Sequence, residues 1–267
     1  MIFNVGPSGL SPYPDFKFTV GSTDYTFDST SQTSSVNNVY YFYRNGTNWE
    51  FYAKTNGTLK FNGSSKIDVF MLGNGSSGGA GSFNVSSQYY PPPNNYTLYW
   101  CSSVNGGSGG AGGTRKTNRG IIASGDYAVT IGSTSSFGTL KSNDTGYSQA
   151  NQNGNGGYCF DDENAVGIDG NNYLVGAGGG RGGYTMTDGV TPSTTSPQNG
   201  GTTGGGKGGT SSAGSAGTGS AASCYGAGGG GGGAWGNSNQ TYSESGHGGK
   251  ANGGAGKAGF VAIRNAR

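Results

Sequence analysis

The sequence is poor in aliphatic residues, in charge and in helix-forming segments. Hydrophobic residues make up 31% of its 267 positions and charged residues 10%, so a conventional core can occupy only part of the chain. No stretch has the apolar spacing of an amphipathic helix, and glycine at this density costs about 1 kcal/mol per residue relative to alanine in a helix. We therefore expect a mainly β fold with little or no helix.

Several classes of site are excluded by what is missing. Fifteen basic and 13 acidic residues give a formal net charge of +2, which provides no field that would attract nucleic acid. The three cysteines, Cys101, Cys159 and Cys224, are odd in number and widely spaced without a CxxC pair, so they fit neither a zinc site nor a disulfide framework. The sequence predicts no metal site, no cofactor and no nucleic-acid partner.

Targeting signals are also missing. The first residues contain neither the basic segment nor the apolar segment of a secretory signal peptide, and no apolar run is long enough to cross a membrane. We expect a protein that is made in the cytoplasm and does not insert into a membrane.

Glycine is what the sequence has in excess, with 59 residues in 267 where ordinary usage is about 7%. Low-complexity disorder is one interpretation of such a composition. An aromatic content of 12% and β-type segments at both ends of the chain favour an ordered fold. Collagen is excluded because the strict Gly-X-Y period is absent.

The sequence of the N-terminal quarter predicts a small antiparallel β region. Short aromatic and β-branched runs are interrupted by Asn-Gly pairs at 45–46, 56–57 and 62–63, a strong hairpin signal. The expected strands are 16–20, 39–43, 49–53, 59–61 and 66–72, with two more at 127–131 and 260–264. We predict a β-rich attachment region over 1–65 and a glycine-rich domain over 66–267.

The remaining glycines are concentrated in tracts that polar and aromatic insertions separate: 73–81, 105–113, 176–183, 200–219, 226–236 and 246–259. Ordering glycine costs more backbone entropy than ordering any other residue, so hydrogen bonds must compensate. A threefold extended helix has no internal hydrogen bonds, and its N–H and C=O groups need external partners. Without side chains, neighbouring tracts can approach closely enough to bond to one another. We expect the tracts to pack as polyglycine-II helices with the insertions projecting as loops.

Two glycine-rich motifs resemble nucleotide-binding signatures without the required context. Residues 178–183 satisfy GxGxxG, but no helix-forming sequence follows them. Residues 201–207 read GTTGGGK, but Gly208 stands where a phosphate loop needs serine or threonine. Both matches are expected by chance in so glycine-rich a chain.

Catalytic and calcium-binding constellations are equally weak. His247 is the single histidine and lies inside a glycine tract, far in sequence from acidic residues except Glu244, so we expect a solvated side chain rather than a catalytic one. Residues 161–163 and Asp169 offer carboxylates without the spacing of an EF-hand loop, and we favour a solvated acidic loop. The sequence predicts that the protein is not an enzyme.

Several segments resemble a known family in order and spacing. Residues 49–61 (WEFYAKTNGTLKF) followed by 66–73 (KIDVFMLG) are similar to the start of the glycine-rich tail-fibre and tail-tip proteins of phages and prophages. Residues 127–132 (YAVTIG), 136–138 (SFG) and 256–264 (GKAGFVAIR) resemble later strands of that family. A similar architecture is known in the distal adhesin of T-even-like phage fibres and in a glycine-rich domain of the anaplastic lymphoma kinase receptors.

The chain departs from the family at one tract. Asn74, Ser76 and Ser77 interrupt the glycine run over 73–81. We expect the tract from Asn105 to supply that helix instead.

The resemblance implies a phage tail-tip or tail-fibre component, located in the virion, that binds the host as an adhesin. Its partners would be a bacterial cell-surface glycan or protein and other phage tail proteins, and a homo-oligomer is left open. A purely structural tail or decoration protein is the alternative. An ice-binding protein is a third, but it would need a flat face with regular threonine or alanine spacing, which the long irregular insertions argue against.

The candidate receptor contacts lie on the insertions 83–100, 141–173, 184–199 and 234–245, because loops on a rigid scaffold carry function. Large aromatic rings bring contact area at little conformational-entropy cost; the alternative is that the rings cover the ends of the bundle. The candidates are Tyr89, Tyr90, Tyr96, Tyr99, Trp100, Tyr158, Asp161, Asp162, Trp235 and Tyr242. We expect Tyr90, Trp100, Tyr158, Trp235 and Tyr242 to share one surface.

Overall fold

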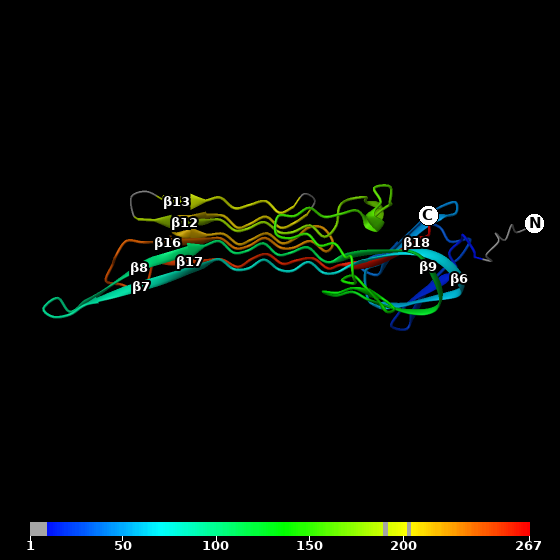
Figure 1. Cartoon of the computed structure of the whole chain (residues 1–267), viewed down its shortest axis with the longest axis horizontal. Coiled ribbons are helices and arrows are strands. Elements are labelled where there is room, and N and C mark those ends of the chain that lie inside the picture. Colours follow the sequence, from blue (N-terminus) through cyan, green and yellow to red (C-terminus); the bar gives the residue numbers. More distant parts are fainter. Residues whose placement is uncertain (1–9, 189–191, 202–203) are drawn as a thin grey trace, which may run out of the picture.

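The protein is a long rod with three zones (Figure 1). The computed structural model describes residues 10–188, 192–201 and 204–267, so parts of the predicted attachment region, of the tract 200–219 and of the insertion 184–199 lie outside the described residues. A β-sandwich forms one end, extended segments form the middle, and hairpins form the other end. We call the sandwich end proximal and the hairpin end distal.

The predicted fold class is confirmed. Apart from the extended glycine segments, the regular structure of the described residues is strand, with two single 3₁₀ turns, η1 (Cys159–Asp161) and η2 (Ile168–Gly170). The scarcity of helix follows from the glycine content.

The proximal sheet joins both ends of the chain. Its ten strands run in the order β11-β10-β9-β6-β18-β5-β4-β3, with β1 pairing β2 and β6. They are β1 (Phe16–Val20), β2 (Thr23–Phe27), β3 (Ser34–Val36), β4 (Tyr40–Asn45), β5 (Asn48–Ala53), β6 (Gly57–Leu72), β9 (Arg115–Thr130), β10 (Ser136–Phe137), β11 (Leu140–Lys141) and β18 (Phe260–Asn265). The domain boundary predicted between residues 65 and 66 falls inside β6, and β18 pairs with β6 and β5.

Strands β5 and β18 and residues 67–72 of β6 are buried on both faces, which explains their nearly continuous hydrophobic sequence. Ile67, Val69 and Met71 face an aromatic core built around Phe16, Phe18, Phe42 and Phe51. Phe70, Leu72, Phe260 and Ala262 face a second core, which residues 159–175 cover. The predicted insertion 141–173 is therefore not a free loop: its second half covers the sandwich, and residues 148–154 bond to Arg115, Gly112 and segment 178–179.

Only one of the three Asn-Gly pairs makes a hairpin. Asn45 ends β4, and Gly46 takes a positive φ of 62° in the turn to β5. The pair 56–57 leads into β6, which does not pair with β5, and the pair 62–63 lies inside β6 at a register irregularity. The hairpins predicted at these two pairs are wrong because the aromatic core, rather than local turn chemistry, sets the strand pairing.

The middle zone is a bundle of extended glycine segments bonded to one another. Residues 226–234 form its centre. Successive N–H groups of this segment donate to three different neighbouring segments in turn. Gly228, Gly229 and Gly230 donate to the carbonyls of Ala177, Ser76 and Ser220 at 2.8–3.0 Å, and the next three residues donate to the same three segments in the same order. The carbonyls of this segment accept, with the same period, from segments 107–113, 251–257 and 206–209. This threefold period is that of a polyglycine-II helix.

The central segment thus has six bonded neighbours among the described residues, which explains its unbroken glycine run. A Cβ on any residue from Gly228 to Gly233 would lie 2.0–2.1 Å from a backbone oxygen of another segment. No side chain fits at such a distance, so residues 228–233, which are enclosed on every side, require glycine at every position.

Peripheral segments need glycine only in the rows that face a neighbour. In segment 105–113, residues three apart form a row along one side of the helix. The row 106, 109 and 112 faces the carbonyls of 176–182, and the row 107, 110 and 113 faces those of 73–79. The third row contains Ser108, which is exposed, and Ala111. The rows of glycine in the sequence therefore report where each segment lies in the bundle.

Two expectations about the tracts are corrected. Segment 73–81 is a member of the bundle despite its polar residues, since Gly75, Gly78 and Gly81 face the central segment while Asn74, Ser76 and Ser77 are exposed. The predicted single tract 200–219 doubles back, because β14 (Ser211–Ser212) and β15 (Ser215–Ala216) form a hairpin and Ser220 then donates to Lys207.

The distal end is closed by hairpins. Strands β13 (Pro192–Thr195), β12 (Tyr184–Thr187), β16 (Ala234–Asn237) and β17 (Gly248–Lys250) form one sheet, and β7 (Ser82–Tyr90) pairs with β8 (Tyr96–Asn105). Cys101, Val104 and Ala234, with Phe83 and Met186 beside them, pack between these strands. The predicted insertion 83–100 is therefore mostly a two-stranded ribbon.

Candidate functional site

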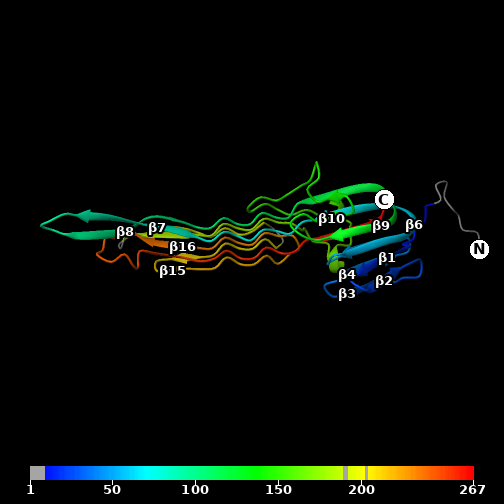
Figure 2. The same ribbon diagram turned by 90° about the horizontal axis from the view of Figure 1, so that it is seen from below.

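The β7–β8 ribbon extends farthest from the bundle (Figure 2). Its turn is closed by Asn94 and Asn95, whose N–H groups donate to the Pro91 carbonyl at 3.2 and 3.5 Å. Tyr90 pairs with Tyr96 across the ribbon, and Tyr89 pairs with Thr97. Because side chains alternate along a strand, Tyr90 and Tyr96 share one face of the ribbon and Tyr89 lies on the other.

Three of the predicted contact residues meet at the tip and form what we call the tyrosine cluster: Tyr90, Tyr96 and Tyr242. The rings of Tyr90 and Tyr96 have centroids 5.0 Å apart, and the Tyr242 ring meets Tyr96 edge-on at 5.3 Å. Tyr242 is 73% exposed. Tyr89, on the other face, is 56% exposed, and its hydroxyl donates to Asn95 Oδ1 at 2.7 Å.

The segment that carries Tyr242 is fixed by two sets of contacts. Thr241 and Tyr99 exchange backbone hydrogen bonds of 3.0 and 2.8 Å, which adds this segment to the edge of β8. At its base, His247 is 2% exposed, with Nε2 lying 2.9 Å from Thr241 Oγ1 and 2.8 Å from the Ser243 carbonyl. The expectation of a solvated histidine is wrong, because the ring closes this loop from inside.

The two tryptophans that were predicted to contact a receptor pack against the protein itself more than they are exposed to solvent. Trp100 and Trp235 are both half-buried. Trp235 lies in β16 between β12 and β17, and a Cβ on Gly249 would be 2.3 Å from its Nε1. Its indole therefore covers the glycine backbone of β17, as the alternative interpretation of the rings expected.

Tyr158, Asp161 and Asp162 lie at the other end of the rod, so the predicted joint surface of five aromatic residues does not include Tyr158. Gly157 bridges to Val175, and Cys159 and Phe160 enter the second core of the sandwich. The physical reason is burial: Phe160 is fully enclosed by the sandwich, which holds its neighbours there.

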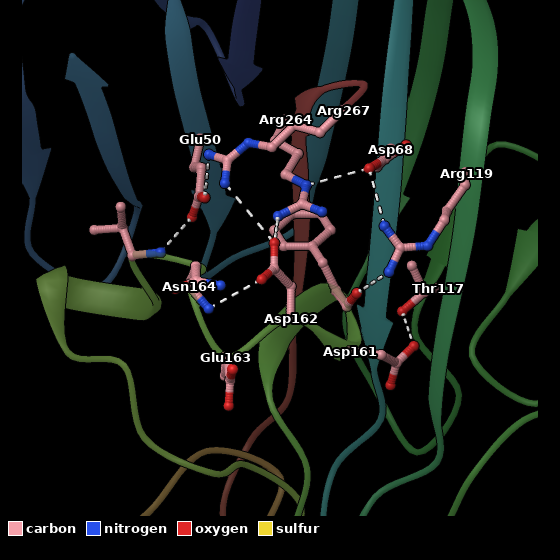
Figure 3. Close-up of polar contacts among 12 residues, drawn as sticks. Glu50, Asp68, Thr117, Arg119, Asp161, Asp162, Glu163, Asn164, Arg264 and Arg267 are labelled. Atoms are coloured by element: carbon pink, nitrogen blue, oxygen red, sulfur yellow. Dashed lines mark hydrogen bonds and ion pairs between the residues drawn. The ribbon is translucent and has the colours of Figure 1, made fainter.

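The two aspartates belong to a network of charges on the sandwich (Figure 3). Asp162 Oδ2 accepts from Arg264 Nη1 at 2.6 Å, and Asp161 Oδ2 accepts from Thr117 Oγ1 at 2.6 Å. Arg264, which is 1% exposed, also contacts Asp68 Oδ2 at 3.2 Å. The expected solvated acidic loop is therefore wrong for Asp162, which anchors the cover loop to β18.

The other members of this network were not identified from the sequence. Glu50 accepts from Arg267 Nη2 at 3.0 Å and from Tyr52 at 2.5 Å, and Arg119 Nη1 approaches Asp68 at 3.4 Å. Glu50 and Asp68 occupy strand positions whose neighbours are hydrophobic. A charge inside such a run was the available signal of a buried ion pair.

This network gives the stability a predicted dependence on pH. Burial raises the pKa of Asp162, but the hydrogen bonds from Arg264 and from the Asn164 N–H, together with the charges of Arg264 and Arg267, bring it below its ordinary value of 3.8. The folded protein therefore holds this carboxylate ionised, and its contribution is present above the ordinary pKa and lost as the pH falls through the lowered one. We expect a melting temperature that declines below about pH 4, with a shallower decline for Asp162→Asn; identical acid profiles for both proteins would contradict this role.

Within the described ranges, no group of three or more histidine, cysteine, aspartate or glutamate side chains is placed to hold a metal ion. The same part of the chain contains no helix with the length and apolarity that crossing a membrane requires. Comparison of the chain with protein-family models, with curated proteins and with solved structures gives no match.

Proposed function

We propose that the protein is a tail-tip or tail-fibre adhesin of a phage, which binds the bacterial surface through its distal tip. The observation that carries this proposal is the exposure of Tyr89 and Tyr242, at 56% and 73%, at the far end of a rigid rod. Exposed aromatic rings on a fixed scaffold are typical of binding surfaces. The resemblance of the β segments to glycine-rich phage tail proteins supports the same function.

The composition of the tip supports recognition as well. Residues 82–105 are rich in tyrosine, serine and asparagine, the residues that antibody loops use for adaptable contacts. The proximal sandwich, at the opposite end, is the part that we propose attaches to other tail proteins.

The alternative is a purely structural spacer in the virion. It is favoured by the bundle itself, because an array of mutually bonded backbones is a stiff rod. A spacer, however, gives no reason for exposed rings at the end of the rod.

Binding of the fluorescently labelled protein to a panel of bacterial cells tests the proposal. We expect saturable binding to at least one strain and a loss of about tenfold or more in affinity for the double variant Tyr89→Ala/Tyr242→Ala, because aromatic anchors contribute most of the energy of such contacts. Tyr147→Ala is the matched control, since Tyr147 is 46% exposed but lies outside the tip. A wild-type protein that binds no strain of a broad panel would favour the spacer.

A further inference from the structure

We propose that the ligand of the tyrosine cluster is an uncharged oligosaccharide. The inference rests on the proposed adhesin function and names the chemical class of its receptor. It depends on the charge and the side-chain chemistry of the tip.

The first step is the absence of charge from the ribbon. No lysine, arginine, aspartate or glutamate occurs in residues 82–105. Charged residues elsewhere at the distal end include Asp188 after β12, Glu244, two positions from Tyr242 in the sequence, and Lys250 at the end of β17. A phosphate-bearing polymer is recognised by clustered arginine and lysine, so the ribbon is not built for a polyanion.

The second step is the chemistry that the cluster offers instead. The Tyr242 ring contacts Tyr96 through an edge-to-face packing and is otherwise largely open. The C–H face of a pyranose carries weakly positive hydrogens, which suit the negative face of an aromatic ring. The same ribbon and loop carry exposed amide residues, Gln88, Asn94 and Gln240, which can donate to and accept from sugar hydroxyls.

The third step distinguishes a sugar from a protein receptor. Protein interfaces draw their energy from tryptophan, tyrosine and arginine anchors that become fully enclosed. At this tip the two tryptophans are already half-buried against the protein's own strands, and the ribbon has no arginine. A narrow ribbon with open tyrosine faces and amides fits a saccharide chain better than a surface of the size that a stable protein complex buries.

The experiment measures binding of the labelled wild-type protein to isolated envelopes of a strain that it recognises. Envelopes are oxidised with periodate, which cleaves vicinal diols of sugars, or digested with a broad protease, and binding is repeated at low and high sodium chloride. We expect binding to be lost after periodate, kept after protease, and changed by less than about twofold between 50 and 500 mM salt, because neutral contacts are not screened. Loss after protease, or a steep fall with salt, would overturn the inference while leaving the adhesin function intact. Absence of binding to untreated envelopes of every strain would instead count against the proposed function.

A pair of variants tests the ring itself. Tyr242→Phe keeps the stacking face and is expected to bind within about twofold of the wild type, whereas Tyr242→Ala is expected to lose about tenfold. The side chain is 73% exposed, so neither change should alter the melting temperature, and Tyr147→Ala again serves as the control. Equal loss in Tyr242→Phe and Tyr242→Ala would show that the hydroxyl, not the ring face, makes the contact, and would contradict the stacking part of the proposal.

Discussion

Replacing Gly230 with valine is expected to prevent the bundle from forming. A Cβ at this position would lie 2.0 Å from the Lys207 carbonyl oxygen and 2.4 Å from its carbon. Relief would require moving segment 206–209 away, which would break its hydrogen bonds to the Gly228 and Gly231 carbonyls and also those that it accepts from segments 180–183 and 217–220. We expect a loss above about 3 kcal/mol, at the upper end of what overpacking costs, measured as thermal unfolding by circular dichroism.

Gly79→Ala is the matched control within the same bundle. A Cβ at Gly79 would meet the Ser108 Oγ at 3.0 Å and no backbone atom closer than 3.5 Å. The serine side chain can rotate, so we expect a change below about 1 kcal/mol. A Gly230→Val protein that melts at the temperature of the wild type would show that the close packing of the central segment is not what organises the rod.

Replacing Arg264 with alanine is expected to produce the largest loss in the sandwich. The substitution leaves Asp68, which is 1% exposed, without its buried cation, and takes the partner of Asp162 away. It also removes the guanidinium that lies 4.5 Å from the centre of the Phe160 ring. Removing one partner of a buried pair typically costs about 3–5 kcal/mol, and we expect the cover loop 159–175 to become sensitive to proteolysis.

The substitution Arg119→Ala tests whether the burial of Arg264 determines how much its contact with Asp68 stabilises the fold. Arg119 contacts the same Asp68 carboxylate at 3.4 Å, but its side chain is 50% exposed. We expect its loss to cost below about 1 kcal/mol, as for exposed ion pairs. Arg119 Nη2 also donates to the Phe160 carbonyl at 2.6 Å, so equal destabilisation by the two substitutions would mean that the buried contact of Arg264 is not the dominant one in the network.

The sequence predicted the bundle because glycine leaves few alternatives, but the position of each segment depended on a pattern that composition does not convey. The run from Gly228 to Gly233 belongs to the one segment that we find enclosed by six others in the described residues. The polar residues of segment 73–81 were predicted to exclude it from the bundle because their spacing was not considered. On the side that faces the central segment, its glycines recur at every third position. The positions of glycine at a spacing of three residues show which sides of each segment face a neighbour in the bundle.

The site was harder to predict because its elements are distant in sequence. Tyr96 and Tyr242 meet only after the bundle has brought β8 and the segment before β17 to the same end. Tyr158 was placed wrongly because Phe160, two residues later, is drawn into the core of the sandwich. A loop between two glycine tracts can emerge at either end of the rod, and the hydrophobic residues within it decide which.

Hydroxyl-radical footprinting of the protein bound to recognised envelopes tests the proposed distal binding most directly. The side chains to compare are Tyr89 and Tyr242 at the tip with Tyr147 and Ile122 away from it, all of which are exposed in the free protein at 46–73%. We expect binding to protect Tyr89 or Tyr242 from oxidation while Tyr147 and Ile122 react as in the free protein. Protection of Ile122 and Tyr147 with a fully reactive tip would contradict the account, because it would place the receptor contact on the sandwich end of the rod.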